Sequence, residues 1–236
     1  MDVIVIKKLI IIPAYNEEKN ILKVIENVRS NAPDFDYIVI DDCSGDRTAE
    51  ICRENNVNVL SLPINLGIGG AMQTGYKYAA FKGYDCAVQI DGDGQHDASY
   101  AEEMVGKLKN HDLVIGSRYI DKQGFQSSFM RRLGIRYFCF LIKLLTGRRF
   151  TDPTSGLRAC NKKTIEYFAK HYPLDYPEPE VIVHLSRKNF SICETNVIMH
   201  ERKGGTSSIT PVKSVHYMLK VSLGILFAWL DYDPNL

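Results

Sequence analysis

The chain's most informative stretch is Cys86-Ala87-Val88-Gln89-Ile90-Asp91-Gly92-Asp93-Gly94-Gln95-His96-Asp97. Its apolar first part predicts a buried strand, and Asp91 and Asp93 follow that strand with one glycine between them. Two crowded carboxylates repel each other unless a cation or a shared proton lies between them. Hard oxygen ligands suit Mg²⁺ and Mn²⁺, and Mg²⁺ is usually bound by one or two carboxylates together with substrate phosphates. The stretch therefore predicts a site for Mg²⁺ or Mn²⁺ with a diphosphate, although Asp-Gly-Asp-Gly is also ordinary turn chemistry.

The sequence around this stretch alternates between strand-like and helix-like segments. Apolar and β-branched runs predict strands at residues 3–12, 37–40, 57–62, 86–90 and 112–115. The first strand is expected to end at Pro13, and Asn16 can cap the helix after it. Further helices are predicted from Asp46 and over residues 71–81. This alternation predicts an α/β fold with a doubly wound, mostly parallel sheet whose ligands bind at the carboxyl ends of the strands.

The second half of the chain has a different pattern. Residues 130–145 combine apolar and basic residues at helical spacing, and residues 212–230 predict a C-terminal amphipathic helix. Residues 190–199 predict a late strand. Because there is no repeat, low-complexity tract or linker, we expect a single domain over residues 1–236, with its two halves meeting at about residue 120.

Composition excludes several classes of protein. Hydrophobic residues make up 45% of the 236 residues and charged residues 24%, with a net charge of +1, so nothing indicates nucleic-acid binding. The six cysteines lack metal-binding spacing, and we expect them to be reduced thiols of a cytoplasmic protein. The longest apolar stretch near the C-terminus, residues 221–230, is far shorter than the roughly 20 residues that span a bilayer, so we expect no membrane crossing.

Polar clusters follow three of the predicted parallel strands: residues 13–17, Asp41-Asp42 and Asp91-Gly92-Asp93. In a doubly wound sheet these strand ends converge on one crevice. A nucleotide needs a face for its base, an acceptor for a base N–H and charge neutralisation at its diphosphate. Tyr15, Asp41 and a metal on Asp91 and Asp93 are candidates for these roles in turn, while capping of a turn is the alternative for Asp41.

Several motifs together resemble those of family 2 glycosyltransferases. They are Pro-Ala-Tyr-Asn-Glu from residue 13, Ile-Asp-Asp from residue 40, Asn-Leu-Gly-Ile-Gly-Gly-Ala from residue 65 and the Asp-Gly-Asp-Gly-Gln-His-Asp segment. The resemblance continues at residues 116–119, 151–158 and 202–207, and so covers about residues 8–210. The dolichyl-phosphate mannose synthase-like enzymes, which use polyprenyl-phosphate acceptors, are the most similar branch. The resemblance implies a GT-A nucleotide-diphospho-sugar transferase fold, a divalent metal and inverting transfer of a hexose or N-acetylhexosamine.

The resemblance also implies roles for individual residues. Those implied to bind the nucleotide-sugar are Pro13, Tyr15, Glu17, Asp41, Asp42, Asn65, Gly67, Asp91, Gly92, Asp93, Gln95 and Arg202. Those implied to bind the acceptor are Arg118, Arg131, Ser155 and Arg158. Asp93, Arg118, Arg202 and Glu180 are the candidate catalytic residues. Arg132 and Arg136 compete with Arg131 for its role, and a solvated helix face is an equal alternative for this basic segment.

The acceptor class stays open on the sequence alone. A lipid phosphate is already anionic and needs no strong base, whereas a sugar hydroxyl of a cell-wall or capsular saccharide requires a carboxylate base. Glu178 and Glu180 lie in Tyr176-Pro177-Glu178-Pro179-Glu180, which departs from the simplest mannose synthase pattern. Either glutamate is a candidate base, and a proline-stiffened surface loop is the alternative. A nucleotidyltransferase or a non-catalytic binding protein is a weaker interpretation.

The expected partners follow from these assignments. They are a nucleotide-sugar, with a UDP-sugar favoured over a GDP-sugar, and a polyprenyl phosphate or saccharide acceptor. Residues 130–145 and 212–230 are candidates for peripheral contact with the cytoplasmic face of a membrane. Recruitment by a small membrane protein, packing of these helices on the sheet, or a homodimer interface formed by them are the alternatives.

Overall fold

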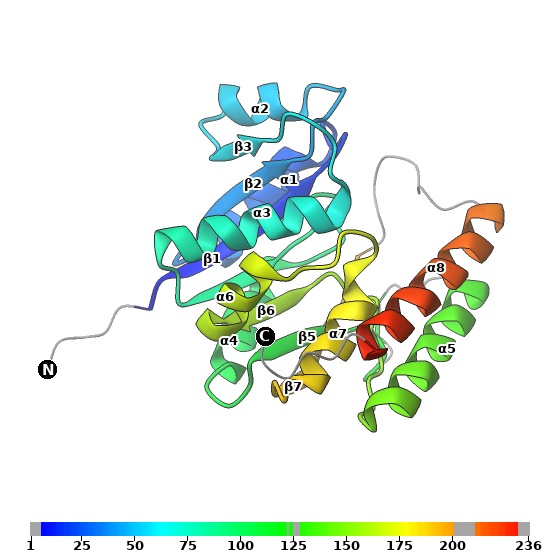
Figure 1. Ribbon diagram of the computed structural model, residues 1–236. Coiled ribbons are helices and arrows are strands. Elements are labelled where there is room, and N and C mark those ends of the chain that lie inside the picture. Colours follow the sequence, from blue (N-terminus) through cyan, green and yellow to red (C-terminus); the bar gives the residue numbers. More distant parts are fainter. Residues whose placement is uncertain (1–5, 122, 125–127, 201–210, 231–236) are drawn as a thin grey trace, which may run out of the picture.

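The computed structural model describes residues 6–121, 123–124, 128–200 and 211–230. A seven-stranded sheet in the order β3-β2-β1-β4-β6-β5-β7 is covered by helices on its faces (Figure 1). The strands are β1 (Lys8–Ala14), β2 (Asp36–Asp41), β3 (Val59–Ser61), β4 (Cys86–Gln89), β5 (Leu113–Ser117), β6 (Arg158–Asn161) and β7 (Ile192–Asn196). The helices are α1 (Ile21–Asn31), α2 (Thr48–Glu54), α3 (Gly67–Lys82), α4 (Ala101–Lys107), α5 (Phe129–Thr146), α6 (Lys162–Lys170), α7 (Pro177–Arg187) and α8 (Pro211–Leu230). A 3₁₀ turn, η1 (Ala98–Tyr100), precedes α4.

The sheet is mostly parallel, as the sequence predicts. β1 pairs in parallel with β2 and β4, and β5 pairs in parallel with β7. β6 runs antiparallel to both of its neighbours, β4 and β5. Of the strands that follow residue 120, β6 lies between β4 and β5 and β7 lies beside β5, so both belong to the sheet that the first half of the chain begins.

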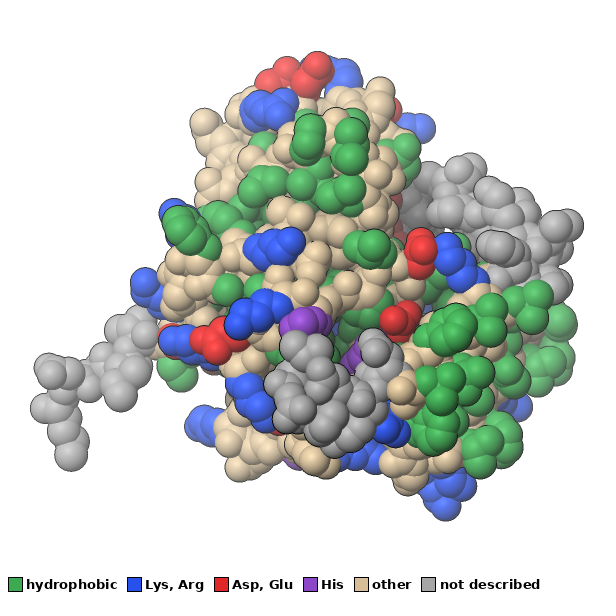
Figure 2. Space-filling view, viewed as in Figure 1, with side chains coloured by type: hydrophobic (Ala, Val, Ile, Leu, Met, Phe, Trp, Pro, Cys, Tyr) green, Lys and Arg blue, Asp and Glu red, His purple; other side chains and the backbone are tan. Residues whose placement is uncertain are grey.

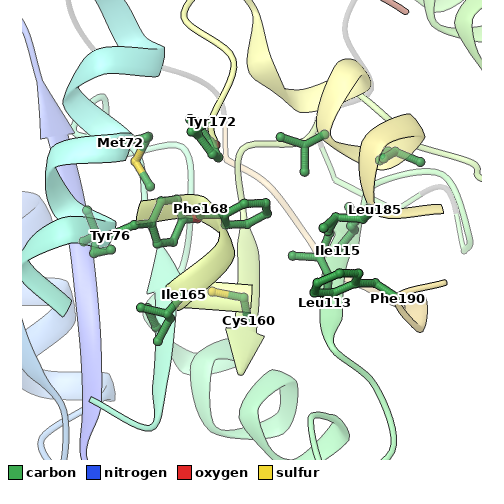
Figure 3. Packing of buried hydrophobic residues seen from close by; sticks show 14 of the residues in the cluster. Met72, Tyr76, Leu113, Ile115, Cys160, Ile165, Phe168, Tyr172, Leu185 and Phe190 are labelled. Carbon is green, nitrogen blue, oxygen red and sulfur yellow. The ribbon is translucent and has the colours of Figure 1, made fainter. Parts of the chain in front are cut away.

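Alternate residues of the strands bury two separate cores. One core joins the sheet to α3, α6, α7 and α8 and includes Leu9, Ile11, Ala87, Leu113, Ile115 and Cys160 from the strands. Figure 3 shows Met72 and Tyr76 of α3 meeting Ile165 and Phe168 of α6 in this core, beside Tyr172. The other core lies under α1 and α4 and includes Ile10, Ile12, Val88, Val114 and Ala159. Since side chains alternate along a strand, Gln89 and Arg158 lie on the first of these faces, next in line after Ala87 and Cys160.

Two local predictions need correction. β1 continues through Pro13 to Ala14, because β4 pairs only as far as Ile11 and leaves no ladder partner that needs a proline N–H. The first helix is capped at Asn20 rather than Asn16, and the Glu17 carbonyl accepts hydrogen bonds from its first N–H groups. Asn16 instead adopts φ 57° and accepts a hydrogen bond from the Gly45 N–H at 2.8 Å.

Element boundaries also differ from the predictions. α2 begins at Thr48, whose N–H donates to Asp46 at 2.9 Å, and α3 begins at Gly67, four residues before the predicted start. Residues 177–180 form the first turn of α7 instead of a surface loop, with Pro177 at its first position, where a missing N–H costs nothing. Strand β6 and helices α4 and α6 were not predicted.

Among the helices in the described ranges, none is both long and apolar enough to cross a bilayer. The two longest, α5 and α8, lie side by side at one end of the molecule (Figure 1). The Ser222 hydroxyl of α8 donates a hydrogen bond to the Tyr137 hydroxyl of α5 at 3.2 Å. These helices therefore form a pair beyond the sheet's edge.

Candidate active site

The ends of β1, β2 and β4 meet at one edge of the sheet. Ala14 is paired with Asp41, and the Asp42 N–H donates to the Ala14 carbonyl at 2.9 Å. On the other side of β1, the Gly92 N–H donates to the Pro13 carbonyl at 3.2 Å. A Cβ atom on Gly92 would lie 2.9 Å from that carbonyl oxygen, so glycine permits the close approach. The three polar clusters therefore come together where the parallel topology predicts.

Asp41 and Asp42 are buried at the end of β2 and hold the surrounding loops. Asp41 accepts a hydrogen bond from the Ser44 N–H at 3.2 Å. Asp42 accepts one from the Leu66 N–H at 2.7 Å, and the Asn65 amide donates to the Asp42 carbonyl at 3.1 Å. Asn65 also accepts from the Gly67 N–H at 3.2 Å, which links the end of β2 to the start of α3.

The segment after β1 divides its side chains between solvent and interior. Tyr15 is 51% exposed beside the strand ends, as an aromatic platform for a base would be. Glu17 is buried and accepts a hydrogen bond from the Asn20 amide at 2.7 Å, while its N–H donates to the Thr48 hydroxyl at 2.8 Å. Glu17 thus fastens the loop to α1 and α2.

Asp91 and Asp93 are partly exposed at the end of β4. The Gln89 amide donates to Asp91 Oδ1 at 3.0 Å, and the Asp91 N–H donates to His96 Nδ1 at 3.1 Å. Because Nδ1 accepts, the neutral ring carries its proton on Nε2, which lies 3.8 Å from Asp91 Oδ2. Asp93 Oδ1 accepts from the Gln95 N–H at 3.0 Å, and the Gln95 amide reaches the His200 carbonyl at 3.3 Å.

This donor set fits a metal that arrives with a diphosphate. Within the described parts of the chain, no three His, Cys, Asp or Glu side chains gather to form a complete protein cage for a metal ion. Mg²⁺ typically takes one or two carboxylates and completes its shell with phosphate oxygens and water. Asp91 and Asp93 supply that number of carboxylates, with His96 and Gln89 supporting Asp91.

Arg118, the residue after β5, forms a buried ion pair with Asp152. Its Nε and Nη2 donate to the two carboxylate oxygens at 2.6 and 2.7 Å. Arg118 is 6% exposed and Asp152 fully buried, and the bidentate geometry raises the pKa of Arg118 despite the opposing effect of burial. Glu194 of β7 accepts hydrogen bonds from the N–H groups of Thr151 and Asp152 at 2.8 to 2.9 Å, and burial raises the pKa of Glu194. A continuous network thus runs from β7 to Arg118.

Two residues that the resemblance places at the acceptor lie beneath the surface. Ser155 is 1% exposed and Arg158 is 2% exposed. Arg158 donates from Nε to the Ser155 carbonyl at 2.8 Å and from Nη2 to the Pro153 carbonyl at 2.9 Å. Its guanidinium therefore bonds to the chain itself and is shielded from any acceptor in solvent.

The two glutamates of α7 have different surroundings. Burial raises the pKa of Glu178 to about 6, with Arg158 lowering it and Asp91 raising it, so Glu178 stands within electrostatic range of the β4 and β6 ends. Glu180 instead lies 3.5 Å from His184 Nε2. It also packs against α8, where a Cβ on Gly224 would lie 2.8 Å from its carboxylate. Of the two glutamates, Glu178 is therefore the one whose carboxylate responds to the charges of Arg158 and Asp91.

Tyr217 of α8 marks the second side of the site, and sequence reasoning missed it. Its ring packs edge-on against Tyr176 at 4.6 Å between centroids. Burial raises the pKa of its hydroxyl, and the charges that act on it come from Glu178, Arg131 and Arg118. The exposed Arg131 of α5, Arg118 just after β5 and Glu178 of α7 are thus within electrostatic range of one phenol. Arg202 lies outside the described residues.

Sequence reasoning also left Gln89 and Asp152 without roles. A polar residue within the apolar run before Asp91 was a usable signal for Gln89, because residues two apart in a strand share a face. Asp152 stood in a quoted motif, yet its pairing with a residue 34 positions away has no local signature.

The comparisons with known proteins agree with this geometry. The family model described as "Glycosyl transferase family 2" matches residues 9–168. The UDP-N-acetylglucosamine–dolichyl-phosphate N-acetylglucosaminyltransferase of Methanococcus voltae is 29% identical, with 91% of this chain and 88% of that protein covered. The polyprenol monophosphomannose synthase of Mycolicibacterium smegmatis is 26% identical, with 92% of this chain and 86% of that protein covered.

A solved structure shares the fold. Glucosyl-3-phosphoglycerate synthase from Mycobacterium tuberculosis, crystallised with Mn²⁺, UDP and phosphoglyceric acid, superposes with a TM-score of 0.72 at 19% identity. The superposition covers 96% of this chain and 79% of that one. The likeness confirms the predicted GT-A-type α/β fold.

Proposed function

The chain belongs to glycosyl transferase family 2, and from this premise we propose that it transfers a hexose or N-acetylhexosamine from a nucleotide-diphospho-sugar to a polyprenyl phosphate. One observation carries the proposal: Asp41, Asp42, Asp91 and Asp93 meet at one edge of the sheet, close to a second group of charged residues around Tyr217. The first group suits a nucleotide diphosphate and the second suits an anionic acceptor.

On the donor side, each group has a distinct task. Tyr15 offers an exposed ring for the base, and Asp41 offers a carboxylate acceptor for a base N–H. Asp91 and Asp93 would hold Mg²⁺ or Mn²⁺ against the diphosphate. When bound, the metal neutralises the charge that develops on the departing nucleotide diphosphate. A UDP-sugar is favoured because the M. voltae relative is named for UDP-N-acetylglucosamine and the M. tuberculosis synthase was crystallised with UDP.

On the acceptor side, the exposed Arg131 supplies positive charge for a phosphate, while Arg118 is 6% exposed and has its charge balanced by Asp152. The acceptor phosphate is ionised at neutral pH, so one of its oxygens attacks C1 of the sugar directly. The C1–oxygen bond to the diphosphate breaks as the new C1–oxygen bond forms, and configuration at C1 inverts. The names of the M. voltae and M. smegmatis relatives, both polyprenyl-phosphate or polyprenol enzymes, support this acceptor class.

A saccharide acceptor is the second candidate, and Glu178 is the observation that favours it. A sugar hydroxyl must lose its proton during attack, and a carboxylate with a pKa of about 6 is well placed to take it near neutral pH. Glu178→Gln and Glu180→Gln are a matched pair of variants. If a saccharide is the acceptor, only the Glu178 variant loses turnover; with a lipid phosphate, neither loss is expected from base chemistry.

A membrane surface is the proposed location of the reaction. Figure 2 shows hydrophobic side chains gathered over α5 and α8 with Lys and Arg near them. On α5, Met130 is 71% exposed and Leu144 68% exposed, and Arg131, Arg136 and Lys143 lie on the exposed part of the same helix. Apolar side chains with basic neighbours suit the boundary between acyl chains and anionic headgroups. Co-sedimentation with anionic vesicles that weakens with salt is expected, and a dimer or a small membrane partner covering α5 and α8 would instead abolish vesicle binding.

The experiment that tests the function measures nucleotide diphosphate release. UDP- and GDP-sugars are supplied with Mn²⁺ or Mg²⁺, with and without a short polyprenyl phosphate. Release should require one donor, the metal and the lipid phosphate. Asp93→Asn should lower it beyond the 10- to 100-fold that loss of a supporting group typically costs. Asp34→Asn, an exposed carboxylate between α1 and β2, is the matched control and should match the unaltered chain. Donor-independent or metal-independent release would contradict the proposal.

A further inference from the structure

Arg158 is a buried cation whose position needs compensating contacts. It begins β6 opposite Gln89 of β4 and Ile115 of β5, so its side chain lies on the same face of the sheet as that of Gln89. Only 2% of the residue is exposed. A guanidinium keeps its charge throughout the pH range of a folded protein, and a buried charge is costly unless it is paired and hydrogen-bonded. The contacts of Arg158 therefore indicate what it does.

Both side-chain hydrogen bonds that Arg158 makes with the described residues go to one loop. Its Nε donates to the Ser155 carbonyl at 2.8 Å, and its Nη2 donates to the Pro153 carbonyl at 2.9 Å. We name residues 153–156 the brace loop. Asp152, which binds Arg118, immediately precedes this loop. Arg158 thus fixes the backbone of a segment that lies between the two sides of the site.

The brace loop borders the Asp91 carboxylate. A Cβ atom on Gly156 would lie 2.4 Å from Asp91 Oδ2 and 3.0 Å from its Cγ, closer than real Cβ atoms approach. From the other side, the Gln89 amide donates to Asp91 Oδ1 at 3.0 Å. The Asp91 carboxylate is therefore confined between Gln89 and the loop that Arg158 holds.

Two buried polar atoms remain unpaired next to this arrangement. Within the described part of the chain, neither Arg158 Nη1 nor Gln89 Oε1 has a hydrogen-bond partner. The two residues are paired across β4 and β6, so the two unpaired atoms belong to neighbouring side chains. Each buried unpaired group lowers the stability of the fold by about 1–3 kcal/mol. The charges of Arg158 and Asp91 both act on the Glu178 carboxylate of α7. Because this arrangement lowers stability and lies beside Asp91, we look for its role in the site rather than in core packing.

We propose that Arg158 is a positioning residue of the nucleotide-sugar site: by bracing residues 153–156, it fixes the Asp91 carboxylate where that group binds the metal–diphosphate. The inference rests on the proposed function and extends it. It gives Arg158 a role through Asp91, and no contact with the acceptor, because the guanidinium is shielded from solvent.

The test is Mn²⁺ binding in the presence of UDP and, in parallel, GDP, by titration calorimetry well below the melting temperature. Arg158→Lys keeps the charge but loses the rigid guanidinium fork that donates from Nε and Nη2 to the two carbonyls, and should weaken Mn²⁺–nucleotide binding about 10- to 100-fold. Arg148→Lys is the matched control, since Arg148 Nη1 also donates to a backbone carbonyl at 2.7 Å, but the acceptor is Phe190 and not a residue of the brace loop. That control should bind within about twofold of the unaltered chain.

A second variant acts on the same contact from the loop. Gly156→Ala should also weaken binding, and the double variant should lose less than the two single losses combined, because both act through the brace loop. It keeps the inference testable if Arg158→Lys does not fold. An Arg158→Lys or Gly156→Ala protein that is folded and binds Mn²⁺–nucleotide normally would overturn the inference, even if its melting temperature fell. An unaltered chain that binds neither Mn²⁺–UDP nor Mn²⁺–GDP would overturn the proposed function itself.

Discussion

Asp152→Asn should destabilise the protein strongly, because it breaks the buried pair with Arg118. Asp152 is fully buried and Arg118 is 6% exposed, and two hydrogen bonds of 2.6 and 2.7 Å join them. Removing one partner of such a pair leaves an uncompensated buried charge and costs about 3–5 kcal/mol. Asparagine keeps one acceptor oxygen, so we expect a loss near the lower end, about 3 kcal/mol. For a chain of this size, that corresponds to a fall of roughly 6–12 °C in Tm.

Urea denaturation followed by circular dichroism measures this loss. Equal slopes for variant and unaltered chain would show that the change lies in stability and not in the compactness of either state. Glu54→Gln is the control, because Glu54 and Arg47 are joined at 3.0 Å while both are 59% exposed. An exposed pair of this kind contributes at most about 1 kcal/mol. An Asp152→Asn midpoint that shifts no further than the Glu54→Gln midpoint would refute the reasoning.

Three other changes have expected outcomes. Burial raises the pKa of Glu178 from 4.5 to about 6, so the folded chain holds this proton more tightly than the unfolded chain does. The free energy of unfolding should therefore fall by up to roughly 2 kcal/mol as pH rises through that interval. Glu178→Gln should remove this fall, as measured by urea denaturation at about pH 4.5 and about pH 7. Gly69→Ala would place a Cβ 2.2 Å from the Leu174 carbonyl oxygen and should cost about 1–3 kcal/mol, whereas Gly106→Ala, with open space in α4, should stabilise by roughly 0.5–1 kcal/mol; equal midpoints in urea would contradict both. Cys43 is exposed just after β2, so N-ethylmaleimide should label it before the buried thiols, and UDP should slow the labelling seen by peptide mass spectrometry; a rate unchanged at saturating UDP would place the nucleotide elsewhere.

The parallel strands were predictable because each has a local signature. β2, β4 and β5 lie within or beside apolar runs that end at polar residues, and their alternation with helices predicts that they run parallel. β6 has no such signature: it is four residues long and begins with a buried arginine. Its antiparallel pairing with both β4 and β5 is non-local, so no pattern along the chain reports it.

The candidate site also has a part that the sequence predicts and a part that it does not. Convergence of the Asp41 and Asp91 clusters follows from strand direction alone. The choice between Glu178 and Glu180 depends on where α7 begins, because two residues differ by about 200° around a helix. The structure shows that α7 begins at Pro177, and this start fixes which side of the helix each glutamate occupies. Likewise, the bracing of residues 153–156 by Arg158 depends on a cross-strand pairing with Gln89 that the sequence does not display.

The most direct test of the central claim is the identity of the product. The protein is incubated with UDP-N-acetylglucosamine, UDP-glucose or GDP-mannose, Mn²⁺ and a short polyprenyl phosphate, and the organic phase is analysed by mass spectrometry. The account predicts one new species, the polyprenyl phosphate enlarged by a single sugar residue, with inverted configuration at C1 and absent with Asp93→Asn. Recovery of unmodified lipid phosphate from every donor, while the same protein glycosylates a saccharide, would contradict it.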